Sequence, residues 1–188
     1  PNNPDWLWFG TTDGLYPLNL ADDTMHFWSH DQGNFPGPGI TMLHFDAEGT
    51  LWVGTAFGEE GDWIGPGEAA LVKIASPADP ENLSWEIAAS LNDPFYDGDW
   101  YVLSMAEDNQ GDIWLGTDES VYHRIGDRWV RLVESDGAPE YESVRSIAVT
   151  DQAIWFAVWY RGLYRYDPAG WYNLQREGTG TNNIHRLY

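Results

Sequence analysis

The chain has 188 residues, enough for one domain with a substantial hydrophobic core. Its 30 acidic and 9 basic residues give a formal net charge of −21, which disfavours binding to nucleic acids and anionic membranes. The 12 Trp, 10 Tyr and 7 Phe argue against the disorder that such acidity can accompany. Cysteine is absent, which excludes disulfides and thiolate metal sites, and no apolar run is long enough to predict a membrane-spanning helix.

One short pattern recurs along the chain. Its clearest copy is Gly49-Thr-Leu-Trp-Val-Gly-Thr55, and further copies lie at 5–11, 111–117 and 152–157, the last with Ala157 in place of the glycine. The tryptophans at its centre are separated by 44, 62 and 41 residues and are Trp8, Trp52, Trp114 and Trp155. A repeat of about 40–45 residues carrying four short strands is typical of a β-propeller blade.

In chain order, each repeat predicts four strands separated by turn residues. First strands are expected at 41–45, 101–105 and 144–149, and each second strand carries the tryptophan pattern. Third strands are expected at 14–18, 70–74, 120–124 and 162–166. Fourth strands are expected around a second set of tryptophans, namely Trp28, Trp85, Trp129 and Trp171. We expect both sets of tryptophans to pack between blades.

Tight turns are predicted between the first and second strands. They are Asp46–Gly49, Asp108–Gly111 and the shorter Asp151–Ala153. Aspartate at the start and glycine at the end suit a hairpin, because glycine adopts positive φ without a steric penalty.

The combined pattern, Asp-x-x-Gly-x-[Leu/Ile]-Trp-[Val/Leu]-Gly-Thr followed by Gly-Leu-Tyr, resembles the two-component regulator propeller repeat. The best copies are residues 41–55 and 102–117, and the resemblance extends over nearly the whole chain. Repeats of that family form periplasmic sensor propellers in bacterial hybrid sensor kinases and occur in other extracellular propellers. The resemblance therefore implies a propeller fold and an extracellular, sensor-like role, while the motif residues themselves are structural.

The two ends of the chain predict a seam. The sequence begins within a second strand, and residues 183–188 have the pattern of a first strand. We therefore predict an all-β, single-domain propeller over residues 1–188 with four blades of four antiparallel strands, the first completed by the C-terminal strand. The blades are expected at 183–188 plus 1–30, 40–89, 100–134 and 143–176, and the seam residues are Ile184, Arg186, Tyr188, Trp6 and Trp8.

Three arrangements remain open for this seam. The ring closes within one chain, the C-terminal strand completes a neighbouring molecule to give head-to-tail oligomers or fibres, or the chain is one unit of a longer array. The closed ring is the arrangement that the sequence favours.

The second blade is longer than the others, and its insertions at 58–67 and 90–99 are expected on the same face as the links between blades. This loop-rich face should collect aromatic side chains among carboxylates, a combination that suits sugar rings or cationic groups. The alternative is that these aromatics hold the long loops against the blades. The expected ligand-binding residues are Trp63, Phe95, Tyr96, Trp100, Tyr141, Trp159, Tyr160 and Arg161, and Phe35 is expected on the same face.

No cofactor is predicted, although two acidic groups have the oxygen ligands that Ca²⁺ prefers: Glu59, Glu60 and Asp62, and Asp93, Asp97 and Asp99. Their spacing matches no defined calcium loop, and solvated acidic loops are the simpler interpretation. Asp108–Asp112 resembles part of a calcium loop but coincides with the repeat turn. The five histidines lack metal-binding spacing, and no nucleophile elbow, phosphate loop or dinucleotide motif is present.

These features favour a non-enzymatic ligand-binding propeller whose partner is a glycan or another small polar molecule. A structural subunit that self-associates through its terminal strands is the alternative, and a polysaccharide hydrolase or lyase is the third. Neither nucleic-acid binding nor membrane insertion is expected. The chain opens at Pro1, from which, together with its acidity and lack of cysteine, we expect an exported protein in the periplasm or outside the cell.

Overall fold

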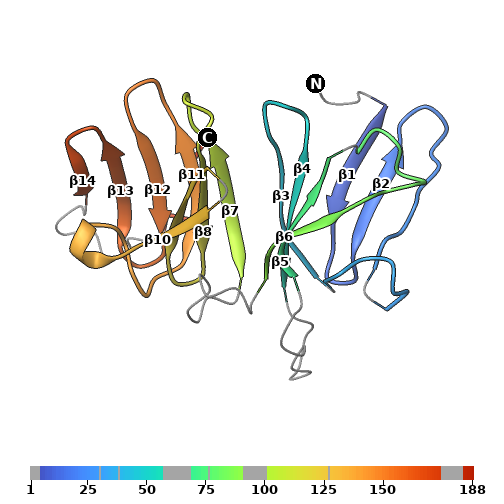
Figure 1. Cartoon of the computed structure of the whole chain (residues 1–188), viewed down its shortest axis with the longest axis horizontal. Helices are drawn as coiled ribbons and strands as arrows, with labels where there is room; N and C mark the ends of the chain where they lie inside the picture. Colours follow the sequence, from blue (N-terminus) through green and yellow to red (C-terminus); the bar gives the residue numbers. More distant parts are fainter. Residues whose placement is uncertain are drawn as a thin grey trace. The chain divides into compact units, whose positions relative to one another are not determined.

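The computed structural model describes residues 5–29, 31–37, 39–56, 69–75, 77–90, 101–126, 128–174 and 184–188. The chain forms two compact units, Pro1–Tyr96 with Trp100–Val102 and Asp97–Asp99 with Leu103–Tyr188. All of its sheets are antiparallel, and each sheet is built from strands that follow one another in the sequence (Figure 1). The prediction of one domain over residues 1–188, with the blade limits given above, stays a prediction.

The described part of the first unit contains two sheets. The first sheet, blade 1, pairs β1 (Trp6–Gly10) with β2 (Leu15–Asn19), and isolated bridges join Leu15 to Trp28 and Leu18 to Met25. The second sheet, blade 2, has the order β3-β4-β5-β6, with strands Gly39–Phe45, Leu51–Ala56, Ala69–Ile74 and Glu86–Ser90.

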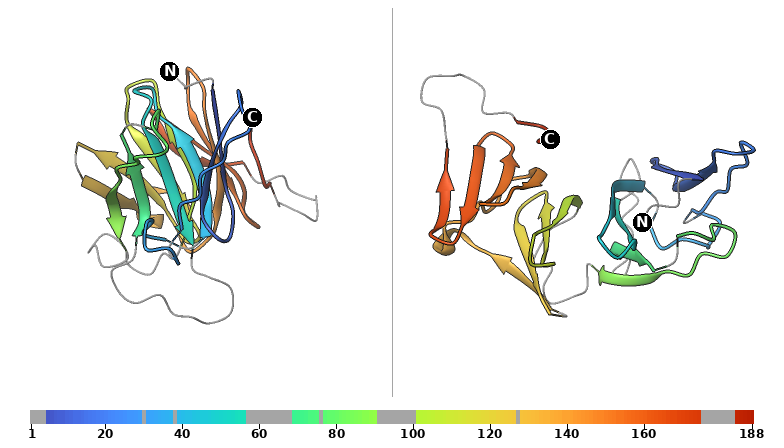
Figure 2. Two further views of the ribbon diagram at one scale, coloured as in Figure 1. Left: turned by 90° about the vertical axis from the view of Figure 1, so that its right-hand side faces the viewer. Right: turned by 90° about the horizontal axis from the view of Figure 1, so that it is seen from above.

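The second unit repeats the four-stranded arrangement twice, and Figure 2 shows the orange-to-red strands of its last blade from above. Blade 3 contains β7 to β10, which are Val102–Glu107, Ile113–Thr117, Val121–Ile125 and Arg128–Leu132. A short 3₁₀ helix, η1 (Glu134–Asp136), follows it. Blade 4 contains β11 to β14, which are Val144–Val149, Ile154–Val158, Gly162–Asp167 and Gly170–Asn173. The all-β propeller fold predicted from the sequence is therefore confirmed.

Two parts of this prediction are not among the strand pairings of the described residues: the fourth strand of blade 1 around Trp28, which is present only as isolated bridges, and the seam. Among the described residues, β1 pairs with β2 alone, and residues 184–188 have no strand assignment. The backbone N–H of Leu187 donates instead to Ser146 Oγ in blade 4, at 3.1 Å. Completion of blade 1 by the C-terminal strand thus stays a prediction.

The aspartate of the repeat turn organises the hairpin that follows it. Asp46 Oδ1 accepts the backbone N–H groups of Glu48 and Thr50 at 3.1 and 2.8 Å, and Asp46 Oδ2 accepts the indole Nε1–H of Trp52 at 2.8 Å. Gly49 closes the turn at φ 85°, a conformation that favours glycine. One carboxylate therefore fixes both the turn and the orientation of the buried tryptophan.

Blade 3 contains the same arrangement. Asp108 Oδ1 accepts the N–H groups of Gln110 and Asp112 at 2.9 and 3.0 Å, and its Oδ2 accepts Nε1–H of Trp114 at 2.9 Å. In blade 4, Thr150 stands at the aspartate position and the turn is one residue shorter. The interaction is thus a property of the two best copies of the repeat.

The repeated tryptophans are buried to different extents. Trp52, Trp114 and Trp129 are at most 6% exposed, and Trp8, Trp28, Trp155 and Trp171 are half-buried. Trp85 is 38% exposed and donates its Nε1–H to the carbonyl of Asn34, so the expectation that it packs in the core is wrong. It lies just before β6, where the alternation of the strand has not yet begun.

Candidate functional site

A cluster of aromatic and arginine side chains lies on the loop-rich face of the second unit. It consists of Arg145, Trp159, Tyr160, Arg161 and His185, with Tyr141 in the adjoining link, and we refer to it as the Arg145–Trp159 cluster. Tyr141 lies in the link between blades 3 and 4, and Trp159, Tyr160 and Arg161 form the turn between β12 and β13. His185 comes from the C-terminal segment.

Trp159 is the centre of this cluster. The guanidinium carbon of Arg145 lies 3.8 Å from its ring centroid, which is a close cation–π contact. His185 meets the same indole edge-on at 5.2 Å between ring centroids, and Tyr160 lies at 5.5 Å. The indole is therefore held in place by three neighbours from three segments of the chain.

Arg145 owes its position to a β-bulge. The pairing of β11 with β12 shifts between Val144 and Ser146, so Arg145 is the extra residue of β11. A bulge redirects its side chain, and bulges are enriched next to functional sites. Burial lowers the pKa of Arg145, and the charge of Asp118 partly opposes this shift. The buried Arg145 Nε and Trp159 Nε1 have no hydrogen-bond partner among the described residues.

Two exposed tyrosines, one in the turn that carries Trp159 and one in the link before β11, have an unusual backbone conformation. Tyr141 and Tyr160 have φ values of 59° and 60°, and their exposed fractions are 71% and 66%. Positive φ is uncommon for a bulky residue, and such strain concentrates at functional sites. The rings are large and presented to solvent, as a stacking surface for a ligand requires.

An ion pair supports the turn that carries Tyr160. Arg161 Nε donates to Glu142 Oε1 at 2.9 Å, and this hydrogen bond raises the pKa of Arg161. The backbone N–H of Arg161 donates to the carbonyl of Val158 and closes the turn. Burial also raises the pKa of Tyr164 on β13 above its ordinary value. Arg161 is thus committed to Glu142, whereas the buried Arg145 Nε has no such partner among the described residues.

The structure brings together three of the eight ligand-binding residues expected from the sequence, Trp159, Tyr160 and Arg161, whereas the ring of Tyr141, in the preceding link, lies 5.7 Å from the guanidinium carbon of Arg131. The other four, Trp63, Phe95, Tyr96 and Trp100, lie outside the described residues, as do the calcium candidates at 59–62 and 93–99. Phe35, which was also expected on this face, is only 3% exposed and belongs to the hydrophobic core of the first unit. Arg145 was missed because a bulge leaves no distinct sequence signal.

The seam residues occupy separate local environments. Trp6 packs against the His26 ring at 5.7 Å, and Trp8 contacts the core of the first unit. Ile184 is half-buried, Tyr188 is fully exposed, and Arg186 lies 5.4 Å from the Tyr188 ring centroid.

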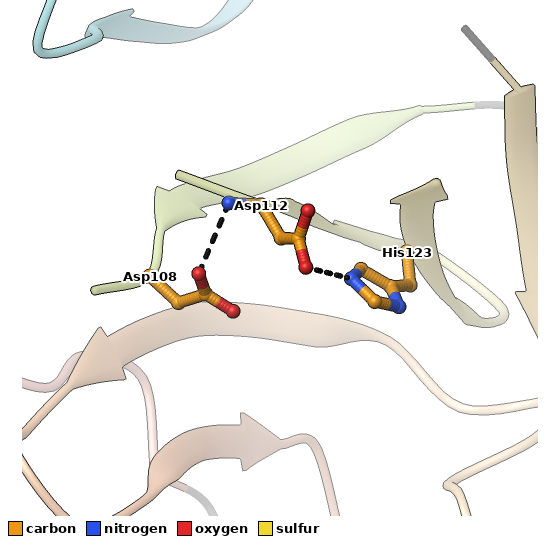
Figure 3. Close-up of side chains that lie close together, drawn as sticks. All are labelled: Asp108, Asp112 and His123. Atoms are coloured by element: carbon orange, nitrogen blue, oxygen red, sulfur yellow. Dashed lines mark hydrogen bonds and ion pairs between the residues drawn. The ribbon is translucent and has the colours of Figure 1, made fainter. Parts of the chain in front are cut away.

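One group of side chains in the described residues has the composition of a metal site. Figure 3 shows Asp108, Asp112 and His123, whose ligand atoms lie within 4.8 Å of one another. However, both oxygens of Asp108 already accept the hydrogen bonds of the repeat turn, and Asp112 Oδ2 lies 3.4 Å from Nε2 of His123. The His123 ring also stacks on Trp114 at 4.1 Å. The group is therefore accounted for as part of the repeat.

Two hollows lie beside the turn Thr150–Ala153 of blade 4, at the ends of the strands that are opposite to the loop-rich face. The smaller has a volume of about 250 Å³ and lies between the turns of blades 3 and 4. The larger, of about 450 Å³, is lined by Trp155, Arg165 and Asp167 with that turn. Both lie at the repeat turn of blade 4, where Thr150 stands in place of the aspartate and the turn is one residue shorter than in blades 2 and 3.

Comparison with known proteins identifies the repeat. The family model described as the two component regulator propeller matches residues 97–119, which include the Asp108 turn and the Trp114 strand. This chain carries the two component regulator propeller repeat. The resemblance inferred from the sequence is thereby confirmed. Curated proteins gave no match to the sequence.

Solved structures share the fold of this repeat protein. The extracellular domain of BT4673 from B. thetaiotaomicron, assigned to a one component system, is 17% identical with a TM-score of 0.75, over 98% of this chain and 24% of that one. PorZ, a surface component of the type-IX secretion system of Porphyromonas gingivalis, is 16% identical with a TM-score of 0.67, over 99% and 28%. The extracellular domain of BT3049 from B. thetaiotaomicron, assigned to a hybrid two component system, is 17% identical with a TM-score of 0.62, over 97% and 22%.

These similarities establish the propeller fold, and the chain spans about a quarter of the length of those structures. The described residues of this repeat protein contain no helix with the length and hydrophobicity that crossing a bilayer requires.

Proposed function

We propose that this chain is the ligand-binding part of an exported, non-enzymatic sensor-type propeller, and that its loop-rich face binds a carbohydrate or another small polar ligand. The observation that carries the proposal is the Arg145–Trp159 stack, in which two buried N–H groups have no partner among the described residues, next to the exposed Tyr160. An extracellular location is supported by the fold shared with the extracellular domains of BT4673 and BT3049.

The chemistry of the cluster suits a hydroxylated ring. The C–H face of a sugar packs against an aromatic ring, and its oxygens accept hydrogen bonds from nearby donors. Tyr141 and Tyr160 offer the aromatic surface, and Arg145 Nε and Trp159 Nε1 offer the donors. A ligand that satisfies these donors recovers part of the free energy that burying them unpaired costs.

The test is a binding measurement on an array of neutral and acidic oligosaccharides, followed by calorimetric titration of the best binder. Trp159→Ala and Tyr160→Ala are expected to weaken binding at least tenfold, and Trp85→Ala, which removes an exposed indole from the first unit, is the matched control. The double variant Trp63→Ala and Trp100→Ala tests the rest of the predicted face. Oligosaccharide binding that is unchanged in the Trp159, Tyr160 and double variants contradicts the proposal, and turnover of a polysaccharide panel would favour the enzyme alternative.

A further inference from the structure

The link between blades 3 and 4 presents an aromatic side chain that contributes little to the fold. Tyr141 is 71% exposed, and its φ of 59° lies in the left-handed region. A bulky residue strains the backbone in this conformation, and an exposed ring gains little of the free energy that burial gives. Strain that is kept at an exposed aromatic ring indicates a role in binding.

Arg131 supports this ring from blade 3. Its guanidinium carbon lies 5.7 Å from the Tyr141 ring centroid, within the range of a cation–π contact. Arg131 Nε donates to Oγ of the fully buried Ser120 at 2.8 Å, and Arg131 Nη2 lies 3.9 Å from Oε1 of Glu140. The Tyr141 ring therefore rests on a side chain that is itself held by blade 3.

The link also joins Tyr141 to the turn between β12 and β13, which is part of the Arg145–Trp159 cluster. The backbone N–H of Trp159 donates to the carbonyl of Ser143 at 2.9 Å. Arg161 Nε donates to Oε1 of Glu142, the residue after Tyr141, at 2.9 Å. These two hydrogen bonds fix the segment that carries Tyr141 beside the turn that carries the cluster.

Tyr141 and Tyr160 nevertheless form two separate stacking surfaces. The Tyr160 ring lies 5.5 Å from that of Trp159, whereas the Tyr141 ring contacts Arg131. Among the described residues, no ring contact joins the two tyrosines to each other. Since one sugar ring packs against one aromatic side chain at a time, two separate surfaces suit a ligand with more than one ring.

We propose that Tyr141 is a second stacking subsite of the loop-rich face, and that the ligand is an oligosaccharide with one ring on Tyr160 and another on Tyr141. The inference rests on the function proposed above and extends it from a single sugar to a chain of sugars. Both segments are fixed by hydrogen bonds before the ligand arrives, so binding orders little of the protein and each stacked ring adds affinity. A single sugar unit reaches one tyrosine and a longer chain reaches both, so affinity should rise with chain length.

The test is titration calorimetry with oligosaccharide ladders of one to six units. The ladders come from two neutral series, β-1,4-glucan and β-1,4-xylan, from the acidic series α-1,4-galacturonan, and from any other series that binds on the array. The affinity of the wild-type chain should rise about tenfold at the length that reaches Tyr141. Tyr141→Ala should remove this rise and leave the binding of the shortest chains unchanged, whereas Tyr160→Ala should weaken binding at every length.

Two further variants serve as controls. Tyr141→Phe keeps the ring and should show the length dependence of the wild-type chain. Tyr172→Ala is the matched control, because Tyr172 is also an exposed tyrosine of the second unit and lies 4.4 Å from the guanidinium carbon of Arg165. This variant should leave the affinity for every length unchanged.

Two results would overturn the inference and leave the function proposed above standing, provided that Tyr160→Ala still weakens binding. The first is a Tyr141→Ala chain with the length dependence of the wild-type chain. The second is a Tyr141→Ala chain that binds every length more weakly by the same factor, which would make the two tyrosines one surface for one ring. A wild-type chain that binds no length of any series would remove both proposals.

Discussion

Replacing Asp108 with alanine removes the carboxylate that organises the turn of blade 3. Three hydrogen bonds of 2.9 to 3.0 Å are lost, two from backbone N–H groups and one from the indole of Trp114. Gln110 is exposed and its N–H can be hydrated, but Trp114 is 2% exposed, so its N–H stays buried without a partner. A hydrogen bond to a charged group contributes about 1.5–3 kcal/mol and an unpaired buried donor costs about 1–3 kcal/mol. We expect a loss of about 3 kcal/mol in the free energy of unfolding.

Urea denaturation followed by tryptophan fluorescence measures this loss, and Asp46→Ala should reproduce it in blade 2. Asp151→Ala removes an exposed aspartate from the equivalent turn of blade 4 and should change the free energy of unfolding by less than about 0.5 kcal/mol. A loss for Asp108→Ala no larger than that of Asp151→Ala would refute the reasoning. If wild-type protein lost the same stability on addition of a chelator, Asp108 would instead act through a metal ion.

Three further predictions concern the second unit. Gly116→Ala should lower the free energy of unfolding by about 1–3 kcal/mol in urea denaturation, because its Cβ would lie 2.7 Å from the carbonyl oxygen of Val144. Tyr160→Gly should raise the free energy of unfolding by about 1 kcal/mol, because glycine adopts positive φ without strain. The same variant should bind oligosaccharide more weakly, and a variant that is no more stable than wild type would show that the turn is not strained. Since burial raises the pKa of Tyr164 above its ordinary value, the unfolded chain loses this proton first, and the free energy of unfolding in urea denaturation should fall as the pH rises above about 10. The fall should be shallower in Tyr164→Phe, and an identical pH dependence would contradict this prediction.

The repeat turn was the most predictable part of the second unit, which contains the candidate site. The spacing of aspartate, glycine and tryptophan predicted the hairpin of blade 3, and the structure adds that Asp108 bonds both the turn and the indole. Sequence spacing also predicted Trp159, Tyr160 and Arg161 on the turn between the second and third strands. It did not predict Arg145, because the extra residue of a bulge is defined only by the pairing of two strands.

By itself, the sequence determined the strand order, the turns and the propeller repeat, because these depend on local spacing and on the two-residue periodicity of strands. Only the tertiary structure decided which aromatic side chains are buried. Phe35 was expected on the ligand-binding face and is in the core, whereas Trp85 was expected between blades and is 38% exposed. Burial depends on which sheets meet across tens of residues of sequence, and spacing along the chain does not specify this. The same holds for the Arg145–Trp159 stack, whose members come from β11, the turn between β12 and β13 and the C-terminal segment, and meet only when blade 4 has formed.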